Sequence, residues 1–344
     1  MKLPVRILLV LLCAILIAAL PFVISSPNML NVVKTELMND GDDEIDFSRL
    51  LISSAMAEDD LEVEDLEEGQ FASHPEWTLP TDFTPGQEPK AENYTENGYE
   101  DESIRVKLET TQFDEGTTIV TAYIRIADPS QLRTMVAKPE KIASTPAKTV
   151  SFLANLANAV IAINGDNYID SPKKTSFEYR MTEKIRSKPN RLKDILIIDD
   201  QGDFHLYIKS QGIEDAPKEM KEAGRSLVNA FTFGPALVKD GELLELDSDY
   251  GYNPGGREPR AAIGQTDRLS YVIVIVQARD RSGSSGMSQG KLAEYMFGIG
   301  CKQAFNLDGG NSAEMVFGEK VFKGMPSGDE RTLSDIIYFA TLQP

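Results

Sequence analysis

A run of consecutive apolar residues constrains the fold of this chain more than any other feature of its sequence. Residues Tyr271–Val276 read Tyr-Val-Ile-Val-Ile-Val, with no polar side chain at any position. β-Branched residues favour strands, and a strand with one face in water would alternate apolar and polar side chains. The run therefore predicts that Tyr271–Ala278 forms a central strand covered by protein on both faces of its sheet.

Shorter apolar runs alternate with turn signals from Ser103 to the end of the chain. We expect further strands at Ile104–Leu108, Thr117–Ile126, Ala159–Ile163, Asp194–Ile198, His205–Lys209 and Ala236–Val238. Helical patterns occupy Pro146–Asn158, Ala216–Gly224 and Ser288–Ile299, the last with Ser288 as N-cap and Gly300 as its stop. Many strands and few helices, without strict alternation, predict an α+β domain with a mixed β-sheet core.

The N-terminus carries a candidate membrane anchor. Lys2 and Arg6 precede an apolar run, Ile7–Ile24, that would span roughly 27 Å as a helix. Positive flanks stay in the cytoplasm, so residues 1–27 predict a single-pass anchor with the rest of the chain extracytoplasmic. A cleaved signal peptide is the alternative, and the remainder would then be secreted.

The negative charge of the chain is concentrated after this segment. The sequence has 35 Lys and Arg against 54 Asp and Glu, a formal charge of −19. Fourteen acidic residues and one basic residue lie between Glu36 and Glu68. Such a segment cannot bury a core, so residues 28–102 predict a disordered linker and residues 103–344 the folded domain. The acidity argues against a nucleic-acid partner. The expected partners are a small-molecule or glycan substrate and, through residues 7–24, the membrane.

Histidine and cysteine are too rare for several kinds of site. Two histidines, His74 and His205, exclude a His-rich zinc centre. Two cysteines, Cys13 and Cys301, make no disulfide framework. Cys301 begins an apolar stretch after a helix stop, so we expect it to be a buried packing residue.

Two loops combine a carboxylate with glycine directly after an apolar run. Asn164-Gly165-Asp166 follows the first, and Asp308-Gly309-Gly310-Asn311-Ser312 follows the second. Glycine lets a ligand approach the backbone, and successive N–H groups can form an anion nest. A plain hairpin turn is the alternative for each loop.

Three arginines lie near such loops. Arg260 precedes a short strand, Arg279 closes the buried run, and Arg331 follows the segment Gly324–Gly328. A guanidinium binds phosphate through two parallel hydrogen bonds. Each could instead be an ordinary surface or ion-paired arginine.

Four segments of the chain together resemble the phosphodiester glycosidase family. They are NGDNY, GGREPRAAIG, ARDRSGSSGMSQGKLAEYMFGIGCKQAFNLDGGNSAEM and ERTLSD. The resemblance covers about Ala159 to Phe339 and reaches loosely back to Ser103. The matching residues are Asn164–Asp166, Gly234-Pro235, Arg260 with Gly264, Gly286-Met287, Asn306–Gly310, Ser312 and Arg331. Two departures stand out. The chain has Gln277-Ala278-Arg279 where relatives have D-G-R, and Asn311 where they have a third glycine.

The resemblance implies hydrolysis of a sugar-1-phosphodiester on the sugar side, in a cell-envelope or exopolysaccharide glycan. It implies that Asp308, Asp166 and Asn164 form the catalytic group. Phosphate would be held by Arg260, Arg279, Arg331, Gly309, Gly310, Asn311 and Ser312. No cofactor is required, and a divalent cation among Asp166, Asp308 and Asn164 is the alternative.

Three other functions remain open from the sequence. A glycosyl-phosphate transferase in envelope polymer assembly would use the same site with a different acceptor. A non-catalytic carbohydrate-binding module would need exposed aromatic side chains, and the single tryptophan, Trp77, falls in the expected linker. An interaction protein would act through its acidic segment.

Overall fold

The computed structural model describes residues 71, 74, 76–113, 116–170, 176–278 and 285–344. The expected anchor, most of the expected linker and Arg279 lie outside these residues. In the described part of the chain, no helix is long and apolar enough to cross a membrane.

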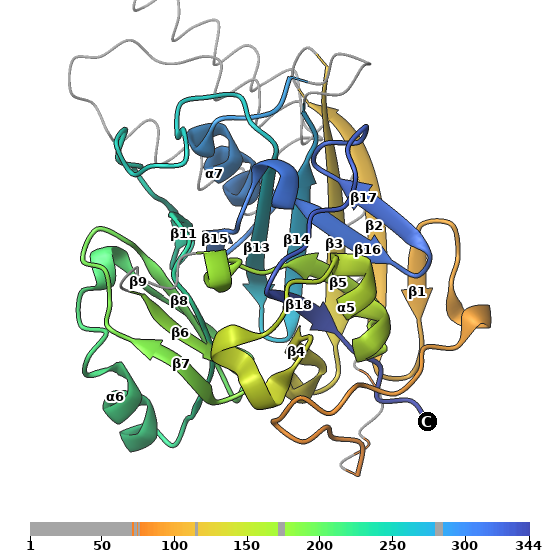
Figure 1. The fold of residues 1–344 in the computed structure, drawn as a ribbon. Helices are drawn as coiled ribbons and strands as arrows, with labels where there is room; N and C mark the ends of the chain where they lie inside the picture. The colour runs from red at the N-terminus through yellow and green to blue at the C-terminus, as the bar shows by residue number, and fades with distance from the viewer. Residues whose placement is uncertain (1–70, 72–73, 75, 114–115, 171–175, 279–284) are drawn as a thin grey trace, which may run out of the picture. The chain divides into compact units, whose positions relative to one another are not determined.

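The strands form three sheets rather than one. Within each sheet, neighbouring strands pair in antiparallel fashion. The largest sheet contains, in spatial order, β1 (Gly98–Glu100), β2 (Ile104–Phe113), β3 (Thr117–Ile126), β14 (Ser270–Val276), β13 (Arg260–Asp267), β15 (Gln303–Asn306), β11 (Ala236–Lys239) and β12 (Glu242–Leu243). β3, β14 and β13 run side by side through its middle (Figure 1). All residues from Tyr271 to Val276 are buried, which confirms the central strand.

Two five-stranded sheets pack against this one. The first contains β7 (Glu183–Ser187), β6 (Phe177–Arg180), β10 (Leu227–Phe231), β8 (Ile195–Asp199) and β9 (Phe204–Tyr207). The second contains β17 (Lys320–Lys323), β16 (Glu314–Phe317), β5 (Ile161–Asn164), β18 (Asp335–Phe339) and β4 (Leu132–Val136). One hydrophobic core joins the inner faces of all three sheets, through side chains such as Ile163, Leu196 and Ile273.

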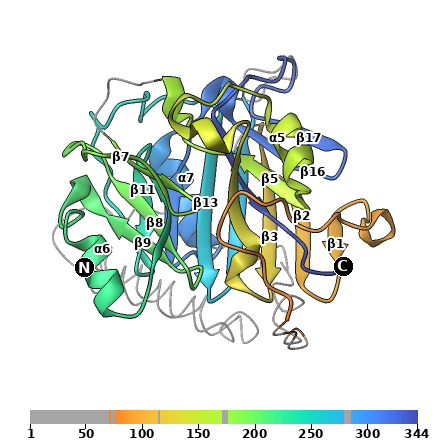
Figure 2. The same cartoon turned by 60° about the horizontal axis from the view of Figure 1, so that its bottom comes forward.

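Each sheet also has a helix on its other face. Alternation within β5 shows this arrangement, because Ile161 and Ile163 enter the shared core while Ala162 packs with α5 (Val150–Ala157). α6 (Ala216–Glu222) covers the first small sheet, and α7 (Gln289–Gly298) covers the large one. In Figure 2, α6 lies at the left of the view and α5 at the upper right, each outside its own small sheet. The α+β class is thereby confirmed.

Most element boundaries agree with the sequence, and two differ for identifiable reasons. α5 begins at Val150 rather than Pro146, because the side chain of Thr149 caps it by accepting the Phe152 N–H at 3.2 Å. The strand expected at His205–Lys209 ends at Tyr207, because Lys209 adopts a left-handed backbone with φ +48°. The α7 cap at Ser288 is confirmed, with Lys291 N–H donated to its hydroxyl at 3.2 Å.

The linker interpretation is wrong for residues 76–102. Leu79 and Tyr99 are buried, and Trp77 and Phe83 pack on the cluster beneath α5. β1 lies within this segment and extends the large sheet. Composition missed this packing because the few apolar residues here show no regular period and rely on a surface formed by distant strands.

Candidate active site

Both glycine loops predicted from the sequence lie together, and Asn164 connects them. The Asn164 amide donates from Nδ2 to the carbonyl oxygen of Asp308 at 2.8 Å and to that of Gly165 at 2.9 Å. Its Oδ1 accepts the N–H of Glu314 at 3.1 Å. Asn164 is fully buried, so its hydrogen bonds hold the two loops from the interior of the protein.

Asp166 belongs to a buried ion-pair cluster that is centred on Arg180. Arg180 Nη2 donates to Asp166 Oδ1 at 2.5 Å, and the Thr232 N–H donates to Oδ2 at 3.0 Å. Arg180 also pairs with Asp335 at 2.9 Å and with Glu178 at 3.5 Å. The cluster therefore brings three carboxyl groups around one guanidinium.

Burial of the cluster changes the pKa values of its members. Burial, and then the charge of Asp166, raises the pKa of Glu178 well above its usual value. Burial likewise raises the pKa of Asp335. Burial would lower the pKa of Arg180, but the three acids outweigh it and raise that pKa instead. Glu178 and Arg180 were not singled out from the sequence, where the one weak signal is a pair of charged residues in a short strand.

Gly165 is needed where this cluster meets its loop. A Cβ at this position would lie 2.0 Å from Asp335 Oδ2, so no larger residue fits. Its N–H also donates to the carbonyl oxygen of Asp335 at 3.0 Å.

Asp308 is more accessible than Asp166 and lies beside an arginine. Its side chain is 15% exposed, against 2% for Asp166. Arg331 Nη1 lies 3.8 Å from Asp308 Oδ2 and donates to the hydroxyl of Ser312 at 2.7 Å. The sequence-predicted group Asp308, Ser312 and Arg331 is thus brought together.

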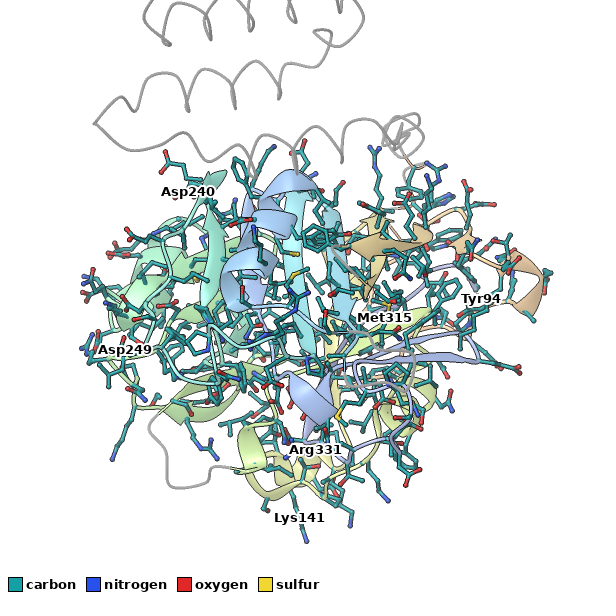
Figure 3. All side chains as sticks on the ribbon, turned by 90° about the horizontal axis from the view of Figure 1, so that it is seen from above. Tyr94, Lys141, Asp240, Asp249, Met315 and Arg331 are labelled. Carbon is teal, nitrogen blue, oxygen red and sulfur yellow. The ribbon has the colours of Figure 1, made fainter. Side chains whose placement is uncertain are left out.

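A cavity of about 290 Å³ opens beside Arg331. Its walls include Asn311, Lys323, Glu330 and Arg331. In the view of Figure 3, Arg331 lies between Met315 and Lys141. Lys323 was not singled out from the sequence, because a lysine at the end of an exposed hairpin strand carries no distinguishing pattern.

Three predicted phosphate holders, Gly309, Gly310 and Arg260, have other neighbours. The Gly310 N–H donates to the carbonyl oxygen of Pro259 at 2.9 Å. Gly309 passes so close to the same residue that a Cβ would lie 2.7 Å from its oxygen. Arg260 donates to the carbonyl oxygens of Tyr252, Asn253, Gly256 and Met287.

The donor set proposed for a divalent cation is already engaged. Both oxygens of Asp166 and the Oδ1 of Asn164 accept protein hydrogen bonds, and Asp308 lies next to Arg331. Across the described ranges, no three His, Cys, Asp or Glu side chains are arranged to hold a metal ion. These residues therefore do not fit a cation site.

Comparison with protein-family models identifies one family. Residues 157–340, more than half of the chain, match the family model for phosphodiester glycosidase. An uncharacterized prophage-derived protein of Bacillus subtilis, YomE, is 32% identical over 109 residues, which is 32% of this chain and 17% of that protein's length. The chain thus spans only about a sixth of this curated relative.

One solved structure with a TM-score above 0.5 shares the fold at low identity. The catalytic domain of zebrafish N-acetylglucosamine-1-phosphodiester alpha-N-acetylglucosaminidase, auto-inhibited by its pro-peptide, superposes with a TM-score of 0.52 at 15% identity, covering 69% of this chain and 83% of that one. A hypothetical protein from Synechocystis gives a TM-score of 0.48 at 16% identity, covering 69% and 62%. From the family match and the sequence motifs that lie within it, the chain belongs to the phosphodiester glycosidase family.

Proposed function

We propose that this protein hydrolyses a sugar-1-phosphodiester, breaking the bond between the anomeric carbon and the phosphate oxygen. The observation that carries the proposal is the pairing of Asp308 with Arg331 at the edge of a cavity that also contains Lys323. Asp308 lies beside Arg331, and Lys323 is a second cation in the wall of the same cavity. That combination suits a reaction in which a sugar becomes positive while a phosphate leaves.

Each residue has a separate role in the proposed reaction. Arg331 and Lys323 hold the phosphate, Arg331 through its planar fork and Lys323 as a point charge. Asp308 stabilises the positive charge that develops at the anomeric carbon. The bond between the anomeric carbon and the phosphate oxygen breaks, and its electron pair leaves on the phosphate. A water molecule adds to the anomeric carbon as the new hydroxyl group and releases its second proton to the solvent. A phosphate leaving group has a low pKa, so the step needs little help from a general acid.

Asp166 and Asn164 act as positioning residues in this scheme. Asp166 is bound to Arg180 and the Thr232 N–H. Asn164 fixes the backbone of Asp308. The scheme uses no metal or cofactor, and we expect activity to survive treatment with EDTA.

We also propose that the domain works outside the cytoplasm, held by residues 7–24, on an envelope or exopolysaccharide glycan. The apolar run and its positive flank support this location. Protease added to intact cells should cut the acidic segment between Glu36 and Glu68. Cleavage only after lysis would contradict the proposed orientation.

The reaction is tested with the full-length chain in detergent and the methyl diester of N-acetylglucosamine 1-phosphate, together with its glucose counterpart. In ¹⁸O-labelled water, cleavage on the sugar side places the label in the released sugar and none in the phosphate. Label in the phosphate would contradict the proposal. Transfer of the sugar to added glycerol, without release of free sugar, would indicate a transferase instead.

Arg331→Ala should raise KM for the diester at least tenfold, because the bidentate phosphate contact is lost. Arg191→Ala is the matched control. Arg191 is also exposed and ion-paired, here with Glu214, and takes no part in the site.

A further inference from the structure

The loop between β17 and β18, residues 324–334, carries Arg331 to the edge of the candidate site. We call it the Arg331 loop. It supplies five of the seven residues that line the cavity, namely Met325, Gly328, Asp329, Glu330 and Arg331. The position of this loop therefore decides where the guanidinium group of Arg331 lies relative to a substrate in the cavity.

Backbone hydrogen bonds fix only the two ends of the Arg331 loop. The first N–H of the loop donates to Ala313 O at 2.7 Å, and the N–H of Leu333 donates to Lys148 O at 2.7 Å. Between these ends, the described residues provide one backbone hydrogen bond, from the Gly328 N–H to Met325 O at 3.0 Å, and it lies within the loop itself. The middle of the loop must therefore be fixed to the domain by side chains.

Glu330 makes this connection, and its partner is Ser151 of α5. Its Oε1 accepts the Ser151 N–H at 3.1 Å, and its Oε2 accepts the Ser151 hydroxyl at 2.8 Å. Ser151 lies in the first turn of α5, where backbone N–H groups have no partner within the helix and the helix dipole favours a negative charge. One residue of the helix thus holds both oxygens of the carboxylate next to Arg331.

Helix α5 is a rigid support for this contact. Val150, Leu153 and Ala157 are fully buried and belong to one apolar cluster with side chains of β5, β16 and β18. The helix lies beside β5 and β18 in Figure 1. Because β5 ends at Asn164, which fixes the backbone of Asp308, the helix and the catalytic loop share one foundation.

The geometry keeps Arg331 close to Asp308 without a direct hydrogen bond between them. Arg331 Nη1 lies 3.8 Å from Asp308 Oδ2, beyond the range of about 2.7–3.2 Å for such a bond. The same nitrogen donates to the hydroxyl of Ser312 at 2.7 Å, and Ser312 is fully buried. Opposite charges at this distance attract, so a loop free to shift would let the two groups close into a direct pair. Such a pair would occupy the donors and the carboxylate that the reaction needs.

We propose that Ser151 is a positioning residue of the site. Through Glu330 it holds the Arg331 loop so that Arg331 reaches the phosphate and stays apart from Asp308. The inference rests on the proposed function, which makes Arg331 a phosphate holder. Ser151 itself touches neither the phosphate nor the sugar.

The test compares Ser151→Ala and Ser151→Thr in the full-length chain in detergent. The alanine variant loses the 2.8 Å hydrogen bond to Glu330 and keeps the helix. It should raise KM for the methyl diester of N-acetylglucosamine 1-phosphate about tenfold. Isothermal titration should show a similar loss of affinity for inorganic phosphate, because both ligands depend on Arg331. Ser151→Thr keeps the hydroxyl and should restore most of the affinity.

A double-mutant cycle tests whether Ser151 acts through Glu330. Glu330→Ala alone should also raise KM, and the variant with both changes should be little worse than Glu330→Ala, because no contact between the two residues is left to break. Additive losses would overturn the proposal.

Ser130→Ala is the matched control. The hydroxyl of Ser130, also half-buried, accepts the Leu79 N–H at 3.0 Å and takes no part in the site. The variant should lose stability and leave KM and phosphate affinity unchanged.

The outcomes separate this inference from the proposed function. If the wild type cleaves diesters while Ser151→Ala keeps its KM and its phosphate affinity, the positioning role is overturned and the function stands. If no diester is cleaved but Ser151→Ala, unlike Ser130→Ala, binds phosphate more weakly, the positioning role stands and the function fails. Equal losses in the two alanine variants, or no phosphate binding by the wild type, would overturn the positioning role.

Discussion

The side-chain amide of Asn164 donates a 2.8 Å hydrogen bond to the backbone oxygen of Asp308, 144 residues later in the chain. The same amide accepts the Glu314 N–H. One buried side chain therefore fixes the end of β5, the loop of Asp308 and the start of β16 relative to each other.

Asn164→Ala should impair both stability and turnover. It leaves buried carbonyl and N–H groups without partners, which costs about 1–3 kcal/mol for each unsatisfied group. The Asp308 loop also loses its support, so kcat of the folded fraction should fall. Asn158→Ala is a suitable control, because that amide donates to Gly86 O at 2.9 Å on another part of the domain. A stability loss with unchanged kcat would limit Asn164 to a structural role.

Two aspartates predicted together should behave differently. Asp308→Asn keeps the shape and removes the charge, so turnover should fall about 10²–10⁴-fold with the fold intact. Asp166→Asn breaks a buried pair with Arg180, which is expected to cost about 3–5 kcal/mol. Turnover and denaturant unfolding are measured on the same samples. A well-folded Asp308→Asn protein with near wild-type turnover would refute the assignment.

The sequence was sufficient for the parts of the site that are local. Asp308 and Asp166 stand next to glycine after buried runs, and both loops are where that pattern predicted. The need for glycine at position 165 could not be predicted, because it comes from the close approach of Asp335, which lies far away in the sequence. The α+β class followed equally from local patterns of strands and helices.

Some residues could not be assigned a role from the sequence, because their interactions are with partners far away in the chain. Arg260 resembled a phosphate ligand because a guanidinium near a glycine-rich turn has no visible partner in the sequence. In the fold its partners are backbone carbonyls, which carry no side-chain signature. Arg180 and Glu178 were not singled out, because nothing in the neighbouring sequence distinguishes them from surface residues. Their burial results from the packing of β6 against Asp166 and Asp335.

Cys301 should be dispensable for activity. The structure confirms that it is buried, and burial raises the pKa of its thiol far above neutrality, so a reactive thiolate is not formed. Cys301→Ala should lose about 1 kcal/mol of stability and keep full turnover. Denaturant unfolding and diester hydrolysis measure the two effects. Complete loss of turnover in a folded variant would point to a nucleophilic thiol.

Glu314 should make the stability of the domain fall as the pH rises. Glu314 is buried and hydrogen bonds to Glu330, whose two oxygens also accept the N–H and hydroxyl of Ser151 at 3.1 and 2.8 Å. Burial, and then the contact with Glu330, raises the pKa of Glu314 to about 9. Lys323 is the cation that opposes this rise.

The direction of this pH dependence follows from proton binding. Between the unfolded pKa of about 4.3 and the folded pKa of about 9, the folded state holds a proton that the unfolded state has released. The free energy of unfolding should therefore decrease with pH across this window, by at most about 1.4 kcal/mol per pH unit from this residue. Glu330 acts oppositely below the window, because hydrogen bonds from Glu314 and Ser151 outweigh burial and lower its pKa.

Glu314→Gln isolates the contribution of this residue, since the amide can donate to Glu330 and cannot titrate. Denaturant unfolding of wild type and variant at pH 5, 7 and 9 gives the difference in slope, in which Glu178 and Asp335 cancel. The variant should gain stability relative to the wild type as the pH rises, and its chief difference should lie between pH 5 and 9. Parallel curves for the two proteins would mean that Glu314 is ionised in the folded state, and the carboxyl pair would then share no proton.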